Sequence, residues 1–244
     1  MDKRLKAKNF LHMSTFKKLS RALRAPYQRY FARRRLRAFH ARARSLEETI
    51  DWAMNFGGGG YYRVKTTQIP VEILALAKTV RALQPKIILE IGTACGGTLL
   101  IWSQLAQQQA IGCDLRDMRH QALLFQDFPP PGSSCRVSLL SGNSHDPAFK
   151  ERVRDTLNGR PVDFLFIDGD HTEAGVSKDY DDYREFVRPG GLIAFHDIVE
   201  HQPYPTNQVY PFWRRLAQQA GTEEIVNDPR QCGFGIGLVH VPPI

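Results

Sequence analysis

The run KIILEIGTACGGT at residues 86–98 joins a short apolar stretch to a glycine-rich turn. Its first part, 86–91, is a nearly continuous Ile/Leu run, which is typical of a strand buried on both faces of a parallel sheet. Gly92 permits a tight turn, and Gly96 and Gly97 let the backbone approach a ligand closely. We therefore expect a strand, a ligand-binding turn and a helix, in this order.

Further apolar runs follow at the spacing of alternating strands and helices. The predicted strands are 86–91, 110–114, 136–140, 162–168 and 191–196, with helices at 70–83, at 97–109 and between the later strands. Such units build right-handed βαβ crossovers. A helix near 208–220 and strands at 223–227 and 233–240 predict an antiparallel hairpin at the sheet edge. The predicted fold class is α/β: a doubly wound, Rossmann-like sheet of seven strands, the last one antiparallel.

The length, composition and cysteine spacing of the chain disfavour several classes of protein. With 244 residues, 42% of them hydrophobic, the chain has room for one large domain and an accessory segment. No run of eighteen apolar residues predicts a membrane-spanning helix, and no apolar stretch near the N-terminus predicts a secretory signal. The cysteines are widely spaced without a CxxC pair, which disfavours a structural zinc site and a disulfide framework; they are Cys95, Cys113, Cys135 and Cys232. We expect a cytoplasmic protein.

Positive charge is concentrated at the N-terminus. Residues 1–44 hold fifteen Lys and Arg and one acid, a net charge of +14, whereas the other 200 residues hold eighteen bases and twenty-four acids, a net charge of −6. Apolar residues recur there at helical spacing: Phe16, Leu19, Leu23, Tyr27, Tyr30, Phe31, Leu36 and Phe39. We expect Pro26 to break this segment into two helices.

We divide the chain into a basic helical arm with a glycine hinge, residues 1–60, and a main domain, residues 61–244. A further helix is expected from Ser45, where a capping box stands, and it stops at four consecutive glycines that form a lid hinge or a linker. Three roles for the arm stay open: packing on the body or on a partner subunit, binding an anionic membrane surface, and binding nucleic acid.

Acidic and polar residues stand where the predicted strands end, which is where ligands bind in open α/β sheets. The turn after the first strand lacks the G-x-G-x-x-G spacing that cradles a pyrophosphate. An acid at that strand end suits a cationic ligand instead, and S-adenosylmethionine (SAM) carries a sulfonium and an ammonium group. The predicted cofactor-binding residues are Glu90, Gly92, Thr93, Gly96, Thr98, Asp114, Asn143, Ser144 and Asp168.

Two of these positions have structural alternatives. Asp114 closes the second strand, where a carboxylate can accept hydrogen bonds from both ribose hydroxyls; a helix cap is the alternative, and position and spacing favour ribose. In the run 141–146, Asn143 or Ser144 is expected to contact the adenine edge. Asp146, with a proline after it, is expected to cap a helix.

Two neighbouring predicted strands end in acidic and imidazole groups. The run IDGDH at 167–171 ends the fourth strand, and FHD at 195–197 ends the fifth. We expect Asp168, His196 and Asp197 to converge above the sheet, where two carboxylates and an imidazole suffice for Mg²⁺ or Mn²⁺. Isolated residues of these types are usually caps or loop contacts, but their coincidence on adjacent strand ends favours a metal site.

If SAM donates its methyl group to a hydroxyl, a proton acceptor is needed beside that hydroxyl. A metal ion lowers the pKa of the hydroxyl and orients its oxygen, and attack on the sulfonium methyl then depends on positioning. His171 has a suitable ordinary pKa, about 6.5, and Asp170 is the second candidate base. His201 is a candidate hydrogen-bond partner for the acceptor.

Three motifs together resemble a known family: EIGTACGGT at 90–98, FIDGDH at 166–171 and RPGGLIAFHDI at 188–198. They resemble class I methyltransferases of the cephalosporin-hydroxylase-like group, which is related to metal-dependent sugar and catechol O-methyltransferases. The resemblance covers about residues 68–241. It implies metal ligands after the fourth and fifth strands, at positions that match Asp168, His196 and Asp197.

The chain also departs from that group. In catechol-type relatives a lysine three residues after the first ligand acts as the base, and His171 stands at that position here. Asp170 matches the base position of some sugar-methylating relatives. The group commonly has an acid where this chain has Asn143, and a neutral amide there implies a different affinity for the cofactor.

The expected function is SAM-dependent, metal-assisted O-methylation of a small-molecule hydroxyl, such as a sugar of a glycoside or natural product. The alternatives are a nucleic-acid methyltransferase, a non-enzymatic SAM-binding scaffold that the arm docks to a membrane or partner, and a nicotinamide oxidoreductase. The missing dinucleotide motif and the terminal hairpin disfavour the last of these. We expect a homo-oligomer with no nucleic-acid partner, and membrane contact through the arm stays one of its open roles.

Overall fold

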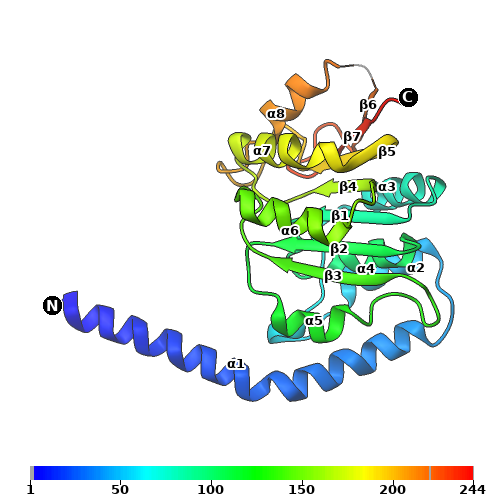
Figure 1. Cartoon of the computed structure of the whole chain (residues 1–244). Helices are drawn as coiled ribbons and strands as arrows, with labels where there is room; N and C mark the ends of the chain where they lie inside the picture. The colour runs from blue at the N-terminus through cyan, green and yellow to red at the C-terminus, as the bar shows by residue number, and fades with distance from the viewer. Residues whose placement is uncertain (1–2, 220, 244) are drawn as a thin grey trace.

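A seven-stranded mixed sheet forms the centre of the molecule (Figure 1). The computed structural model describes residues 3–219 and 221–243, with side chains from residue 22 onward. The strands are β1 (Ile87–Ile91), β2 (Gln109–Asp114), β3 (Arg136–Ser141), β4 (Val162–Ile167), β5 (Val187–His196), β6 (Thr222–Ile225) and β7 (Ile236–His240). Their order is β3-β2-β1-β4-β5-β7-β6. The first five are parallel and β7 runs antiparallel to both β5 and β6, which confirms the predicted fold and its terminal hairpin.

Helices cover both faces of this sheet (Figure 1). They are α1 (Lys3–His40), α2 (Leu46–Asn55), α3 (Pro70–Ala82), α4 (Gly97–Leu105), α5 (Arg119–Phe125), α6 (Pro147–Leu157), α7 (Glu173–Tyr183) and α8 (Val209–Leu216), with short 3₁₀ turns η1 (Gly60–Tyr62) and η2 (Arg184–Phe186). Residues of α1 to α4 share one apolar core with Ile88 of β1, and residues of α6 to α8 share a second core with Leu89. Successive side chains of β1 therefore face opposite layers.

The chain reverses direction across the sheet at β1. From this strand it moves outward to β2 and β3, and then returns to β4 on the other side of β1. Ile91, the last residue of β1, lies opposite Cys113 of β2 and Ile167 of β4. The loops after these strands consequently separate at this point, which is where open α/β sheets bind ligands.

Some predicted boundaries are wrong by a few residues. β5 begins at Val187 rather than at residue 191, because Val187 already pairs with Val162 of β4 across a local irregularity. α4 ends at Leu105 rather than near Gln109, because Gln109 already pairs with β1 and β3.

The N-terminal arm is a single helix, α1, so the prediction of two helices separated at Pro26 is wrong. Pro26 lies inside the helix and is exposed, and Figure 1 shows the helix bent near its middle. Phe16 and Leu19, two of the predicted apolar positions, lie outside the residues whose side chains are described. Among the described residues, none of the helices combines the length and apolar character needed to cross a bilayer.

The segment between the arm and α3 brings the chain to the ligand-binding edge. Ser45 caps α2 with the predicted capping box to Glu48, and the glycine run 57–60 leads into η1. After this turn, Lys65 pairs in parallel with Gly96 of the glycine-rich turn. A Cβ atom added at Gly97 would lie 2.3 Å from the Thr66 nitrogen, so this close approach requires glycine.

Candidate active site

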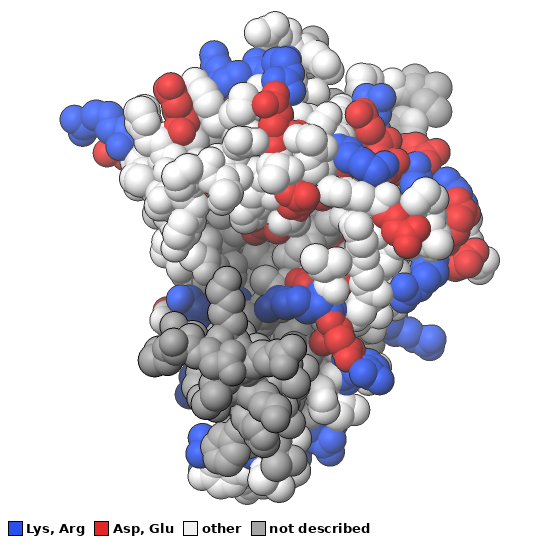
Figure 2. Space-filling model, turned by 90° about the vertical axis from the view of Figure 1, so that its left-hand side faces the viewer, with Lys and Arg blue, Asp and Glu red and all other residues white. Residues whose placement is uncertain are grey.

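A cavity of about 770 Å³ opens at the carboxyl ends of β1, β2, β4 and β5. Figure 2 shows this edge of the molecule, where acidic side chains and Lys or Arg side chains both lie near the middle of the face. The predicted site residues in its wall are Gly92, Thr93, Thr98, Asp114, Asn143, Ser144, Asp168, Asp170, His171, His196 and Asp197. The cofactor and metal residues predicted from separate motifs therefore surround one space.

The glycine-rich turn is held against the loop after β4. Gly92 has φ +99°, and a Cβ atom there would lie 1.9 Å from the carbonyl oxygen of Asp168. Asp168 in turn donates its backbone N–H to the Ile91 carbonyl over 2.8 Å. The two loops are thus in backbone contact, and only glycine at residue 92 allows it.

Glu90 was predicted to contact the cofactor, but it lies behind the turn and outside the cavity wall. Its side chain is fully buried and accepts a hydrogen bond from Trp102 Nε1 at 2.9 Å. Burial raises the pKa of this carboxyl to about 7. Glu90 therefore braces α4 against β1 in the interior.

Gly96 and His201 are likewise outside the cavity wall in the described part of the chain. Gly96 has φ +71°, and a Cβ atom there would lie 2.4 Å from the Phe125 ring, so this glycine serves close packing rather than ligand contact. The main chain of His201 accepts a hydrogen bond from Gly233 in the loop before β7. Its position gives no support to a contact with the acceptor.

Asp114 lies at the end of β2, where its carboxylate faces the glycine-rich turn. Its Oδ2 accepts a hydrogen bond from the Ala94 nitrogen at 2.6 Å, and its Oδ1 pairs with Arg116 Nε at 3.0 Å. It does not cap a helix, because α5 begins at Arg119 with Met118 as its cap residue. The alternative reading of Asp114 as a helix cap is therefore wrong.

The loop after β3 presents Asn143 and Ser144 to the cavity. Asp146 caps α6 by accepting from the Ala148 nitrogen at 3.0 Å, as predicted. Two contacts fasten this loop to α7: His145 Nε2 lies 3.2 Å from the buried carboxylate of Asp179, and the Tyr183 hydroxyl donates to the Ser144 carbonyl at 2.8 Å. The sequence analysis found neither partner on α7.

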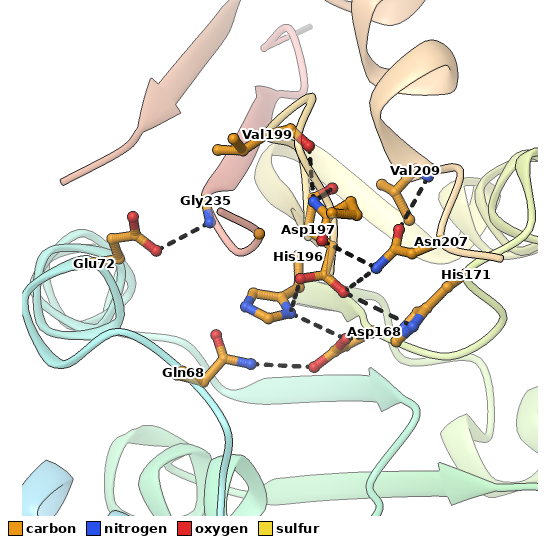
Figure 3. A network of polar contacts seen from close by, with 12 residues as sticks. Gln68, Glu72, Asp168, His171, His196, Asp197, Val199, Asn207, Val209 and Gly235 are labelled. Atoms are coloured by element: carbon orange, nitrogen blue, oxygen red, sulfur yellow. Dashed lines mark hydrogen bonds and ion pairs between the residues drawn. The ribbon is translucent and has the colours of Figure 1, made fainter. Parts of the chain in front are cut away.

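Two carboxylates and two imidazoles meet above β4 and β5 (Figure 3). His196 Nδ1 lies 3.3 Å from an oxygen of Asp168 and 3.3 Å from an oxygen of Asp197. His171 Nε2 lies 3.2 Å from Asp168, and its Nδ1 lies 3.8 Å from Asp197. Ligand atoms of Asp168, His171 and Asp197 all lie within 4.8 Å of one another, which is a spacing that one cation can bridge.

The charges of this cluster stabilise one another. Burial lowers the pKa of His196, but the carboxylates of Asp168 and Asp197 outweigh burial and raise it to about 9. Burial works against ionisation of Asp168 as well, yet its contacts with His196 and His171 hold its pKa well below the ordinary value. The hydrogen bond to Asp168 raises the pKa of His171 against the effect of burial.

Burial and backbone conformation also bear on a divalent cation. His196 is buried, and its Nδ1, which faces both carboxylates, is the nitrogen that a cation between them would meet. Asp197 has φ +66°, a backbone conformation that costs free energy in a residue other than glycine and is frequent at functional sites. The donor set of carboxylate oxygens with one imidazole suits Mg²⁺ or Mn²⁺.

Amide side chains that the sequence analysis missed hold both carboxylates (Figure 3). Gln68 Nε2 donates to Asp168 Oδ2 at 3.1 Å, and Asn207 Nδ2 donates to Asp197 Oδ2 at 2.6 Å. Gln202 donates to the main-chain oxygen of Asp197 at 2.9 Å. Gln68 precedes α3 and the other two lie between β5 and α8, so no strand-end motif could have revealed them.

The two candidate bases differ in their surroundings. Asp170 accepts a hydrogen bond from the Thr172 nitrogen at 2.9 Å, next to the N-terminus of α7. A Cβ atom at Gly175 would lie 2.2 Å from the Asp170 carboxyl carbon, so this side chain is packed on the helix. His171 is half-buried and faces the carboxylates of Asp168 and Asp197.

The comparisons with known proteins agree with this geometry. Residues 89–198 match the sequence model of a methyltransferase-domain family, Methyltransf_24. An uncharacterized protein of Acanthamoeba polyphaga mimivirus is 35% identical over 140 residues, which are 54% of this chain and 60% of that protein. The chain thus covers somewhat less than two thirds of this relative.

Solved structures of O-methyltransferases share the fold. One is the O-methyltransferase TomG of Streptomyces achromogenes, which acts in tomaymycin synthesis and was solved with SAM; the TM-score is 0.56, with 17% identity over 82% of this chain and 91% of TomG. Another is the mycinamycin-pathway methyltransferase MycE, solved with Mg, S-adenosylhomocysteine and mycinamycin VI; the TM-score is 0.58, with 19% identity over 83% of this chain and 56% of MycE. Residues 89–198 therefore match a methyltransferase-domain model, and the chain shares the fold of solved SAM-dependent O-methyltransferases.

Proposed function

We propose that this protein methylates a hydroxyl of a small-molecule acceptor, using SAM as methyl donor and a divalent cation held by Asp168, His196 and Asp197. The observation that carries the proposal is the position of these side chains. They form one wall of the cavity whose other wall is the glycine-rich turn after β1. A cofactor and a cation at these two walls would share one space with the acceptor.

The chain supplies the cofactor site through the ends of three strands. The turn after β1 offers backbone groups close to the loop after β4, and Asp114 at the end of β2 offers a carboxylate suited to ribose hydroxyls. Asn143 and Ser144 stand where they can meet the adenine edge. SAM supplies the electrophilic methyl group when it is bound, and the protein's part is to orient it.

Either His196 or His171 could be the third metal ligand beside the two carboxylates. His196 is buried and lies 3.3 Å from both carboxylates, so it is fixed in the position of a ligand. His171 is more exposed and faces the cavity, which suits a group that accepts the hydroxyl proton and releases it to solvent. A cation held there would lower the pKa of the acceptor hydroxyl. We assign His196 to the metal site and His171 to the base, with Asp170 as the second candidate base.

A glycoside or natural-product sugar is the acceptor class that we favour. MycE, which shares the fold, was solved with Mg and mycinamycin VI, and TomG acts in the synthesis of a natural product. In this chain, the cavity wall continues past the metal site to Pro203, Tyr204 and Phe234, which offer apolar and aromatic surfaces for a sugar ring.

A screen for methyl transfer tests the proposal. The full chain is incubated with SAM labelled in its methyl group and a panel of hydroxylated glycosides, and products are read by mass spectrometry. We expect transfer to an oxygen that stops when EDTA is added and resumes with Mg²⁺ or Mn²⁺. Transfer that is unaffected by EDTA would exclude the metal, and SAM binding without transfer to any acceptor would favour the alternative of a SAM-binding scaffold.

A further inference from the structure

The outward side of α1 carries an apolar stripe that has no partner in the described part of the chain. Ala25, Ala32, Leu36 and Phe39 face the body and are buried. On the opposite side, Leu23, Tyr27 and Tyr30 are 75%, 69% and 60% exposed, and Phe31 is 39% exposed. These four follow the spacing of one helix face, so they form a continuous stripe along the axis.

The aromatic members of this stripe contact one another. The ring centroids of Tyr27 and Phe31 lie 4.5 Å apart, and those of Tyr30 and Phe31 lie 5.3 Å apart. Large apolar side chains that stay exposed as a group mark a surface for another partner. The stripe runs along the helix, and a flat partner can therefore contact its whole length.

The charge of the helix identifies the chemistry of that partner. From Lys3 to His40 the sequence contains thirteen Lys and Arg and no Asp or Glu. Arg34 and Arg37 are exposed and follow the stripe at helical spacing, and in the described residues neither has an ion pair with an acid. Only a strongly anionic partner would neutralise this helix.

From the stripe and this charge together, we infer that α1 docks the protein onto an anionic lipid surface. Helices that lie in a membrane interface combine a basic face with aromatic and leucine side chains that enter the headgroup region. Basic residues next to an anionic leaflet add attraction that salt screens. Pairing of the stripe with the α1 of a second copy fits poorly, because two helices of the same strong positive charge would repel each other.

The position of the helix relative to the cavity agrees with this inference. Figure 1 shows the N-terminal half of α1 leaving the body on the side toward which β3 and β4 point. The cavity opens at the carboxyl ends of the same parallel strands. A surface that contacts this N-terminal half would therefore lie on the same side as the cavity, and the stripe follows directly after it along the helix.

Vesicle sedimentation of the full chain tests the inference. The vesicles are phosphatidylcholine alone, or phosphatidylcholine mixed with phosphatidylglycerol, at low and high salt. We expect binding to the anionic vesicles only, falling steeply with salt. Equal binding to both vesicles, or no binding to either, overturns the inference.

Two variants separate the apolar and the electrostatic contributions. The first replaces the stripe (Leu23→Gln, Tyr27→Gln, Phe31→Gln), and its control places the same kind of change on exposed apolar residues elsewhere (Val71→Gln, Leu123→Gln). We expect at least a tenfold loss of vesicle affinity for the first variant and unchanged affinity for the control, with SAM affinity unchanged in both.

The second variant reverses charge beside the stripe (Arg34→Glu, Arg37→Glu). Its control, Arg81→Glu with Arg136→Glu, makes the same change in net charge at exposed sites outside the arm. We expect at least a tenfold loss for the arm variant and at most a small loss for the control. Equal losses in both variants would mean that net charge alone is responsible, and would overturn the inference. Binding of RNA instead of vesicles would also overturn it. So would a change from dimer to monomer in the variant when neither protein binds vesicles. Circular dichroism and the Tm check that each variant is folded.

Discussion

Gln68 donates a hydrogen bond from its Nε2 to Asp168 Oδ2 over 3.1 Å, although the two residues stand 100 positions apart in the chain. Gln68 is buried and lies directly before α3, so it is fixed by the packing of that helix. Asn207 engages Asp197 Oδ2 in the same way from the far side of the site. Each carboxylate therefore has one oxygen held by an amide, and its other oxygen turns toward His196.

Loss of the amide at residue 68 should weaken metal binding. In Gln68→Leu, Asp168 keeps its charge but loses the contact that orients it, and outer contacts of this kind are typically worth about tenfold or more in metal affinity. Isothermal titration with Mn²⁺ measures the effect. The control Gln107→Leu removes an exposed glutamine that bonds a main-chain carbonyl outside the cavity wall, and it should bind Mn²⁺ as the wild type does. Equal Mn²⁺ affinity in Gln68→Leu and wild type would mean that Gln68 does not position Asp168 for metal binding.

A methyl group at residue 92 should disrupt the junction between the two ligand-binding loops. A Cβ atom in Gly92→Ala would lie 1.9 Å from the Asp168 carbonyl oxygen at φ +99°, so the loops must separate. We expect a loss of about 2–4 kcal/mol in the free energy of unfolding, from the clash together with backbone strain. Urea denaturation gives this value, and SAM binding should fall with it.

Gly132→Ala is the matched control for that change. Gly132 also has a positive φ, +80°, but its Cβ would meet nothing within 4 Å. This variant bears only the strain of the left-handed conformation, about 1 kcal/mol. Similar losses in the two variants would mean that the contact with Asp168 is unimportant.

Ionisation of Glu90 is predicted to lower the free energy of unfolding as the pH rises. Burial raises the pKa of this carboxyl from 4.5 to about 7, so the folded protein favours the protonated form. The resulting stabilisation is fully present below pH 4.5 and disappears as the pH rises through 7. Glu90→Gln is neutral at every pH. Its free energy of unfolding should therefore rise relative to that of the wild type between pH 4.5 and pH 7, by up to about 3 kcal/mol.

Urea denaturation at pH 5 and at pH 8 measures that gain. Glu200→Gln changes an exposed glutamate and should follow the wild type at both pH values. Parallel pH profiles of Glu90→Gln and wild type would mean that Glu90 is not protonated in the folded protein.

His171 and His196 should separate into base and ligand. We expect His171→Gln to bind Mn²⁺ nearly as the wild type does and to lose about 10²–10⁴-fold in methyl transfer, the usual contribution of a general base. His196→Gln should lose affinity for Mn²⁺ itself. The reverse pattern would make His171 the third ligand, which the cluster of Asp168, His171 and Asp197 allows geometrically.

The sheet could be predicted from the sequence because each strand carries its own signal. The Ile/Leu/Val/Phe runs of β1 and β4 reflect burial on both faces, and the strand-end motifs follow from the rule that ligands bind at carboxyl ends. The convergence of Asp168, His196 and Asp197 was predicted on this basis, and the side chains do lie in one cluster. Their role as metal ligands stays a prediction.

Other features depend on distant packing and leave no local signal. Glu90 has the position expected of a cofactor contact, but Trp102 draws its side chain inward. Gln68 and Asn207 reach the site from connections whose sequence shows only where a helix begins. Pro26 in the sequence predicts the end of a helix. In the structure, this exposed proline lies inside a long helix, which bends without ending.

The most direct measurement is titration of Mn²⁺ into the wild type and into Asp168→Asn, with S-adenosylhomocysteine present. The amide keeps the size of the side chain and removes the charge at the centre of the cluster. We predict one Mn²⁺ site in the wild type, lost or weakened at least a hundredfold in the variant. Equal Mn²⁺ binding by the two proteins would contradict the account.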